Sequence, residues 1–327
     1  MINDTIFDLF VSNANAVKKT FIWHNTINKR LTALLYTAEN KAVDVEAIKK
    51  SYELLKQKTG IFSYFRGNSA LNLATLLSLS NNKEERLSDT INVYKMMKYV
   101  GFKSSSYLVI AAFLIASNSG PEDFETRVKR AYEFYNGMKK KHPLLTGQDD
   151  YIFSAMLGLS DVDISIGIDK MESIYSGLKG EFISKNGLQA LTQVLVLGGD
   201  NSIERVLTLR EALRMRSIKM EGRYTLSTLG VLSLLPADTE KIADEVEQTF
   251  RRLRLTRGFG AWSITKDEAL LLSSALVSYN YLDGAKKGIL DAAISTSITN
   301  IIIAQQTAIA AATAASSAAA SASSASN

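Results

Sequence analysis

The stretch DDYIFSAMLGLS, Asp149–Ser160, decides the fold of this chain because its charge-free second half recurs along the sequence. Similar apolar runs end near six anchor positions, which are Ser80, Ser117, Ser160, Gly198, Pro236 and Ser278. Successive anchors lie 37, 43, 38, 38 and 42 residues apart. Near-regular periods in this range are typical of stacked supersecondary units. The spacing therefore predicts six repeats.

An amphipathic segment follows each of the first five anchors. In INVYKMMKYV, the apolar residues Val93, Met96, Met97 and Val100 stand at i, i+3, i+4 and i+7, which predicts a helix with one apolar face. Gly101 follows this segment as a helix stop. No segment alternates between apolar and polar residues with a period of two. We therefore expect an all-α fold of about six stacked helical hairpins, arranged as an α/α superhelix or a closed toroid.

The first helix of each hairpin is expected to lie in the core. None of the nine positions before an anchor, nor the anchor itself, is charged in any of the six repeats. A helix without a polar face is buried on every side. Each run is about eleven residues long, which is too short for a bilayer that needs roughly 17. Some other part of the chain must therefore cover these helices.

The flanking segments suggest how the rest of the chain is organised. Residues 1–60 are expected to form about three helices, the last spanning Asp44–Thr59, ahead of a repeat region at 61–284. Residues 285–315 predict an alanine-rich, almost uncharged helix that packs against the charge-free helices of the repeats. Residues 316–327 predict a disordered Ser/Ala tail. We expect all of these parts to form one structural domain.

Composition narrows the function classes. The 327 residues include no cysteine, which excludes disulfides, cysteine-ligated metals and cysteine nucleophiles. The only histidines, His24 and His142, lack ligand spacing, so we expect neither a metal site nor a cofactor. The first residues, MINDTIFDLF, lack a basic segment of the kind that begins a secretion signal, and we expect a cytoplasmic protein. The net charge of +5 permits an anionic partner without requiring one.

The two adjacent carboxylates of the opening stretch have a structural and a catalytic interpretation. Five of the six residues found eleven positions before the anchors suit a helix N-cap; these six are Ser69, Ser106, Asp149, Gly187, Thr225 and Asp267. We therefore expect Asp149 to cap a helix, with Asp150 favouring the helix dipole. The alternative is an α/α-toroid enzyme that uses acids at the ends of the inner helices, namely Asp149, Asp150, Asp267 and Glu268.

Basic residues precede these caps in five of the six repeats. They are Arg66, Lys103, Lys185, Arg223 and Lys266. Because stacked repeats bring equivalent positions to one edge, these side chains are candidates for binding an anion or an acidic partner at helix N-termini. Ordinary solvated loops are the alternative interpretation.

A second basic cluster falls on two amphipathic segments, ERVLTLREALRMRSIKM and FRRLRLTRGF. Its candidate residues are Arg210, Arg214, Arg251 and Arg254. Adjacent helices could merge these charges into a patch that binds a phosphate backbone. Few aromatic residues accompany them, and nearby glutamates offer ion pairs, so we favour a solvated face over nucleic-acid binding.

Three segments, TGQDDYIFSAMLGLSD, SITKDEALLLSSALV and TSITNIIIAQQTAIAAA, resemble an uncharacterised family of all-helical bacterial proteins that is catalogued as a domain of unknown function. The resemblance implies a cytoplasmic protein of Gram-positive type with no assigned activity. Taken together, the sequence favours a non-enzymatic helical-repeat module for binding or scaffolding, whose partner is a protein or an acidic ligand. Neither nucleic acid nor a membrane is an expected partner.

Overall fold

The computed structural model describes residues 4–67, 70–197 and 203–285, and within these ranges every regular element is helical. The all-α prediction is therefore confirmed. The described residues divide into two compact units. The N-terminal unit comprises 8–67, 70–139 and 146–161, and the C-terminal unit comprises 4–7, 140–145, 162–197 and 203–285.

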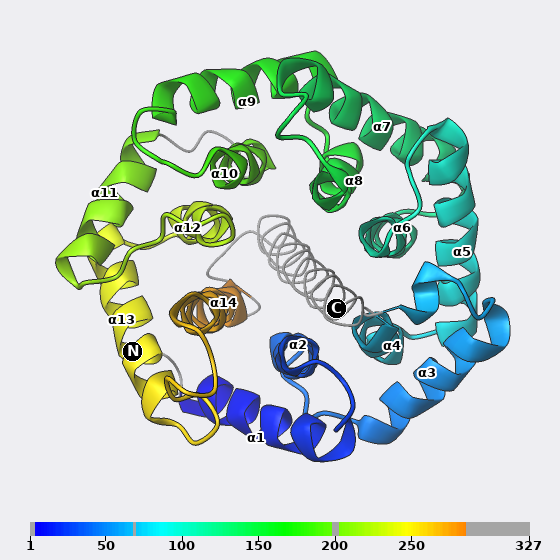
Figure 1. Ribbon diagram of the computed structural model, residues 1–327, viewed down its shortest axis with the longest axis horizontal. Helices are drawn as coiled ribbons and strands as arrows, with labels where there is room; N and C mark the ends of the chain where they lie inside the picture. The colour runs from blue at the N-terminus through cyan, green and yellow to red at the C-terminus, as the bar shows by residue number, and fades with distance from the viewer. Residues whose placement is uncertain (1–3, 68–69, 198–202, 286–327) are drawn as a thin grey trace, which may run out of the picture. The chain divides into compact units, whose positions relative to one another are not determined.

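The N-terminal unit contains two rows of helices (Figure 1). Helices α2, α4, α6 and α8 form one row, and α3, α5 and α7 pack behind it, as seen in the contacts of α3 with α4 and of α5 with α6. Their bounds are α1 Asp4–Thr20, α2 Thr26–Ala38, α3 Val45–Lys58, α4 Ala70–Leu79, α5 Lys83–Val100, α6 Ser106–Asn118, α7 Phe124–Lys141 and α8 Tyr151–Leu159.

The charge-free helices of this unit are covered on every side, as their sequences predict. Consecutive residues from Leu108 to Ala116 in α6 are all buried, and the same is true of Tyr151 to Gly158 in α8. Such burial removes apolar surface from water along the whole circumference of a helix, which contributes about 25 cal/mol per Å². The absence of charge in these sequences follows from this position, because an unpaired charge there would lose its hydration.

A ladder of polar side chains fixes the register of α2 against α4. Its three pairs are Asn28 Oδ1 with Asn72 Nδ2 at 3.2 Å, Thr32 Oγ1 with Thr75 Oγ1 at 3.0 Å, and the Tyr36 hydroxyl with Ser78 Oγ at 2.7 Å. Residue numbers rise together in the three pairs, so the two helices are parallel. Helix α2 therefore lies in the same row as α4, a placement that the sequence did not reveal because Lys29 and Arg30 interrupt the charge-free pattern in α2.

Helices α6 and α8 are also aligned at their starts. The backbone N–H of Lys103, just before α6, donates to the hydroxyl of Tyr151, the first residue of α8, over 3.2 Å. The rings of Phe102 and Tyr151 meet edge to face at 4.8 Å. The starts of α6 and α8 are therefore neighbours, as are those of α2 and α4.

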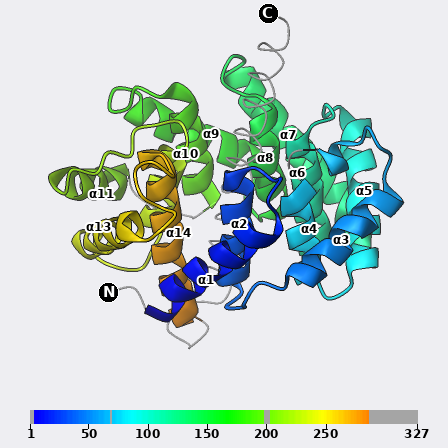
Figure 2. The ribbon, with the colours of Figure 1, turned by 60° about the horizontal axis from the view of Figure 1, so that its bottom comes forward.

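The C-terminal unit repeats the arrangement. Its helices are α9 Ile164–Leu178, α10 Lys185–Leu197, α11 Ile203–Met215, α12 Thr225–Ser233, α13 Thr239–Leu255 and α14 Lys266–Ala285. Helices α10, α12 and α14 pack in sequence (Figure 1), and α11 lies beside α13 (Figure 2). Gly230 of α12 allows α10 to approach, since a β-carbon there would lie 2.8 Å from Leu191 Cδ1.

Several sequence predictions fall outside the described residues. These are the helix at 285–315 beyond Ala285, the tail at 316–327, the cap at Ser69 and the anchor at Gly198. Within the described part of the chain, no helix is both long and apolar enough to span a membrane.

Candidate functional site

The connections that lead into the charge-free helices, and into α2, form what we call the loop edge of each unit. In the N-terminal unit the loop edge comprises residues 21–25, 59–67, 101–105 and 146–150, and in the C-terminal unit it comprises 179–184, 216–224 and 256–265. The predicted basic residues and the described predicted caps lie within these connections or at the helix starts that follow them. The structure shows what each of these side chains contacts.

The capping residues differ from the predicted ones by one to three positions. Ser105, not Ser106, accepts from the Leu108 N–H at 3.1 Å. Ser184 accepts from the Gly187 N–H at 3.2 Å, and Thr265, not Asp267, accepts from the Glu268 N–H at 3.1 Å. A constant distance from the anchor misplaces the caps because the charge-free helices differ in length.

The two carboxylates before α8 also divide their roles differently from the prediction. The chain enters α8 through a 3₁₀ turn, Gln148–Asp150, and the buried carboxylate of Asp150 accepts from the backbone N–H of Gly147 at 2.8 Å. Thr225 makes the equivalent bond to the Gly222 N–H at 2.9 Å. Asp150, not Asp149, therefore makes this hydrogen bond at the start of the helix.

The basic residues predicted at the edge fall into three groups. Lys103 and Lys185 are exposed on the surface. Lys266 donates through Nζ to the Ser217 carbonyl at 3.3 Å, and the guanidinium of Arg223 lies over the Tyr224 ring at 5.7 Å. Lys185 and Lys266 are the first residues of their helices rather than residues preceding the caps.

Arg66 contacts the end of helix α3. Its guanidinium donates to the carbonyls of Lys56 and Thr59 and to the Thr59 hydroxyl. These carbonyls belong to the last turn of α3 and its cap, where the helix has no further N–H groups to offer them. The positive charge of Arg66 therefore stabilises the end of α3.

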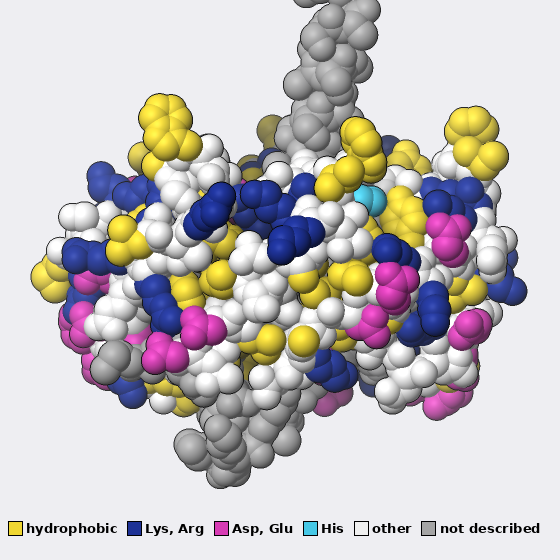
Figure 3. Space-filling model, turned by 90° about the horizontal axis from the view of Figure 1, so that it is seen from below, with side chains coloured by type: hydrophobic (Ala, Val, Ile, Leu, Met, Phe, Trp, Pro, Cys, Tyr) yellow, Lys and Arg dark blue, Asp and Glu magenta, His cyan; other side chains and the backbone are white. Residues whose placement is uncertain are grey.

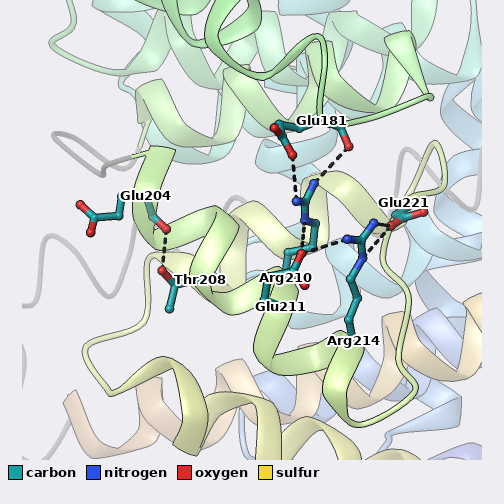
Figure 4. A network of polar contacts seen from close by, with 7 residues as sticks. All are labelled: Glu181, Glu204, Thr208, Arg210, Glu211, Arg214 and Glu221. Carbon is teal, nitrogen blue, oxygen red and sulfur yellow. Dashed lines mark hydrogen bonds and ion pairs between the residues drawn. The ribbon is translucent and has the colours of Figure 1, made fainter.

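The arginine-rich patch of the C-terminal unit is likewise neutralised from within (Figure 4). Arg210 is buried, donates to the Glu181 carboxylate at 2.9 Å and to the Glu181 carbonyl at 3.0 Å, and stacks over Phe182. Arg214 bonds to Glu211 at 2.9 Å and to Glu221. Glu181 comes from the connection between α9 and α10, Glu221 from the connection after α11, and Glu211 from α11 itself.

The other arginines of this cluster have partners too. Arg251 pairs with Glu247 at 2.7 Å, and Arg254 donates to the Ile264 carbonyl at 2.9 Å. Arg205 reaches three carbonyls after α12, those of Ser233, Leu235 and Ala237. Such contacts give the patch a role in joining helices and loops.

A feature that the sequence analysis missed is the exposure of large apolar side chains on the loop edge. Trp23 is 93% exposed and Phe62 is 99% exposed, whereas their neighbours Phe21 and Phe65 are buried. Among the described residues, the exposed large apolar side chains are Ile22, Trp23, Ile61, Phe62, Tyr64, Tyr99, Leu144, Ile166, Ile183, Met215, Leu255 and Trp262. Figure 3 shows such side chains standing out from the surface, with Lys and Arg side chains below them.

All of these residues except Ile166 lie in, or in the last turn before, a connection that leads into α2 or into one of the charge-free helices. The available signal was apolar residues between a helix stop and the next cap, as in FIWHN and GIFSYF. That pattern alone does not distinguish Trp23 from its buried neighbour Phe21.

The histidines are engaged in packing. His24 lies between the rings of Phe21 and Tyr52, at 5.9 and 5.6 Å, and burial followed by the charge of Lys29 lowers its pKa. His142 Nε2 lies 2.9 Å from a carboxylate oxygen of Glu172. Within residues 4–67, 70–197 and 203–285, no three His, Asp or Glu side chains gather as a metal site would require.

The chain matches the model of one known protein family. The family described as "Protein of unknown function (DUF4003)" matches residues 13–307, most of the sequence. This chain belongs to that family. The DUF4003 match runs through both units and continues past Ala285 into the uncharged segment. Neither the curated proteins nor the solved structures contain a match.

Proposed function

We propose that this DUF4003 protein is a non-enzymatic binding module that engages an acidic partner through its loop edge. The observation that carries this proposal is the distribution of exposed apolar side chains, which are concentrated on the loop edge of each unit. Exposed apolar groups of this size are a feature of interaction sites. The exposed lysines nearby, Lys103 and Lys185, suit a partner of negative charge.

The catalytic alternative receives less support. Of its four acids, Asp150 is buried and bonded to Gly147, and Glu268 lies in the first turn of α14, where a carboxylate favours the helix dipole. The phosphate-backbone alternative depends on Arg210 and Arg214, whose charges are paired. We therefore propose neither.

Binding of poly-glutamate at low ionic strength tests the proposed function. The triple variant Lys103→Glu, Lys185→Glu and Lys266→Glu should weaken binding, because each change replaces an attraction by a repulsion. Lys50→Glu, at an exposed position in the first half of α3, is the matched control and should leave binding unchanged. Wild-type protein that ignores poly-glutamate, or equal binding by the triple variant, would reject an acidic partner at this edge.

A further inference from the structure

The loop edge of the N-terminal unit combines apolar tips with positive charge. Two adjacent connections carry the exposed apolar side chains, which we call the first and the second apolar tip. The first tip is Ile22 and Trp23, before α2, and the second is Ile61, Phe62 and Tyr64, before α4. The pairing of Asn28 with Asn72, at the starts of α2 and α4, brings these two connections to the same edge. His24 of the first connection also contacts the Tyr52 ring of α3, the helix that leads into the second connection.

Several basic residues lie next to the first apolar tip in the helices on either side of it. Lys18 ends α1, and Lys29 and Arg30 lie in the first turns of α2. Burial lowers the pKa of Lys29, and the positive charges of Lys18 and Arg30 lower it further. Two further lysines, Lys56 and Lys58, lie in the last turn of α3, just before the second apolar tip. Lys103 lies just before α6.

The opposite connections of the same unit have a contrasting character. Residues 39–44, 80–82 and 119–123 follow α2, α4 and α6, and their charged residues are Glu39, Lys41, Asp44, Glu122 and Asp123. None of the strongly exposed apolar side chains of this unit lies there. The loop edge carries Arg66 and Lys103 as well as Asp149 and Asp150, so the exposed apolar side chains distinguish it, and its positive charge is concentrated at the helix ends beside residues 21–25 and 59–67.

We propose that the loop edge of the N-terminal unit docks on an anionic lipid bilayer, with Ile22, Trp23, Ile61 and Phe62 inserted at the interface. This inference rests on the proposed function and names the acidic partner. These side chains protrude in two small groups, Ile22 with Trp23 and Ile61 with Phe62, and a fluid medium can close around each group. Tryptophan favours the interfacial depth of a bilayer, and lysines near it attract anionic headgroups.

The sequence alone does not point to a membrane partner, because its charge-free helices are too short to span one. Docking on the membrane surface requires no helix long enough to span the bilayer, because only side chains enter it. The C-terminal unit carries the same combination on its own loop edge, where Ile183 and Trp262 are exposed near Lys185 and Lys266.

The experiment uses the full chain and vesicles of two compositions, phosphatidylcholine alone and phosphatidylcholine with about one part in three of phosphatidylserine. The protein has two tryptophans, Trp23 and Trp262, so Trp262→Phe leaves Trp23 as the single fluorescent reporter. We expect this variant to sediment with the phosphatidylserine vesicles at low ionic strength. Its emission should shift to the blue, because the indole leaves water.

Two sets of substitutions separate insertion from attraction. Trp23→Ser with Phe62→Ser should reduce partitioning by about tenfold or more, since each side chain loses its transfer from water. Lys18→Glu with Lys58→Glu should reduce it by about fivefold or more for each residue. Ile166→Ser, an exposed apolar position outside the loop edge, and Lys50→Glu are the matched controls and should change nothing.

Three outcomes would overturn this inference. The first is no sedimentation with phosphatidylserine vesicles. The second is sedimentation without a blue shift, which would indicate attraction by charge alone. The third is unchanged partitioning of the Trp23→Ser, Phe62→Ser variant. Binding of poly-glutamate with no binding of vesicles would leave the proposed function standing and point to a soluble acidic protein, whereas loss of both would reject the two proposals together.

Discussion

Asp150 and Thr225 close the same short turn at the start of a charge-free helix. Each side-chain oxygen accepts from the N–H of a glycine three residues earlier, Gly147 and Gly222 respectively. The helix start lies in a buried environment, where an N–H without a partner loses the bonds that water would supply. At the residue scale, these side chains therefore contribute to stability by satisfying a single donor each.

This role predicts the outcome of substitution at the two adjacent carboxylates. Asp150→Ala should lower the free energy of unfolding by about 0.5–2 kcal/mol, which is the usual range for a lost cap. Asp149→Ala should cost less, because its neighbour keeps the bond to Gly147. Denaturant titration of the two variants measures the difference. A larger loss for Asp149→Ala would show that the first carboxylate is the structural one.

His24 predicts a pH dependence of stability. Its pKa is lowered in the folded protein, mainly by burial and then by Lys29, so the unfolded chain binds the proton more readily. Stability should therefore fall as the pH drops below the ordinary pKa of about 6.5 toward the lowered folded value. His24→Gln should flatten this part of the profile, whereas His142→Gln should leave the contribution of His24 in place. Melting temperatures across the acidic range provide the measurement.

At the scale of elements, close helix contact depends on small residues at particular positions. A β-carbon at Gly158 of α8 would lie 2.7 Å from the backbone nitrogen of Ala131 and 2.8 Å from the carbonyl oxygen of Arg127, both in α7. Backbone atoms of a packed helix cannot move aside as the end of a side chain can. The pairing of α7 with α8 therefore requires glycine at this position.

Gly158→Ala should consequently destabilise the protein despite the better helix propensity of alanine. We expect a loss of about 1–3 kcal/mol, the range for overpacking a core. Gly180→Ala is the matched control, since no atom lies within 4 Å of its β-carbon position. Thermal unfolding of both variants tests the contact; equal melting temperatures would mean that α7 and α8 separate without cost.

At the scale of the whole molecule, the parts of the fold that could be predicted are those with a local cause. Helices such as α6 and α8 lack charge because they are buried on all sides, and a composition of that kind is visible in the sequence. The sequence did not reveal that α2 belongs to the same row, because Lys29 and Arg30 interrupt its apolar pattern. The apolar runs thus located the helices α4, α6, α8, α10, α12 and α14 but not α2.

The candidate site could be predicted less well because it depends on contacts between distant residues. Arg210 is bonded to Glu181, 29 positions away, and Arg66 to the end of α3. Residue type also does not reveal exposure: Phe65 is 3% exposed and Phe62 is 99% exposed within the same connection. Charge patterns located the loop edge, but only tertiary structure separates the residues that hold the fold from those that face outward.

The uncharged segment after Asp291 supports a prediction for the whole chain, although it lies outside the described residues. The DUF4003 match continues to residue 307, so residues 292–307 of this segment belong to the family's shared sequence. From its lack of charge and its isoleucines, we expect it to pack on the charge-free helices. Burying four isoleucines would contribute on the order of 6–12 kcal/mol before chain entropy is counted, comparable to the net stability of a domain.

Truncation after Asp291 should therefore give a protein that aggregates or melts at a much lower temperature. Truncation after Ala315 is the matched control, because it removes only the final Ser/Ala run, and it should leave the melting temperature unchanged. Size-exclusion chromatography and thermal unfolding of the two truncated proteins provide the measurement. A monomeric protein lacking everything after Asp291, with the melting temperature of the full chain, would mean that the charge-free helices need no cover from this segment.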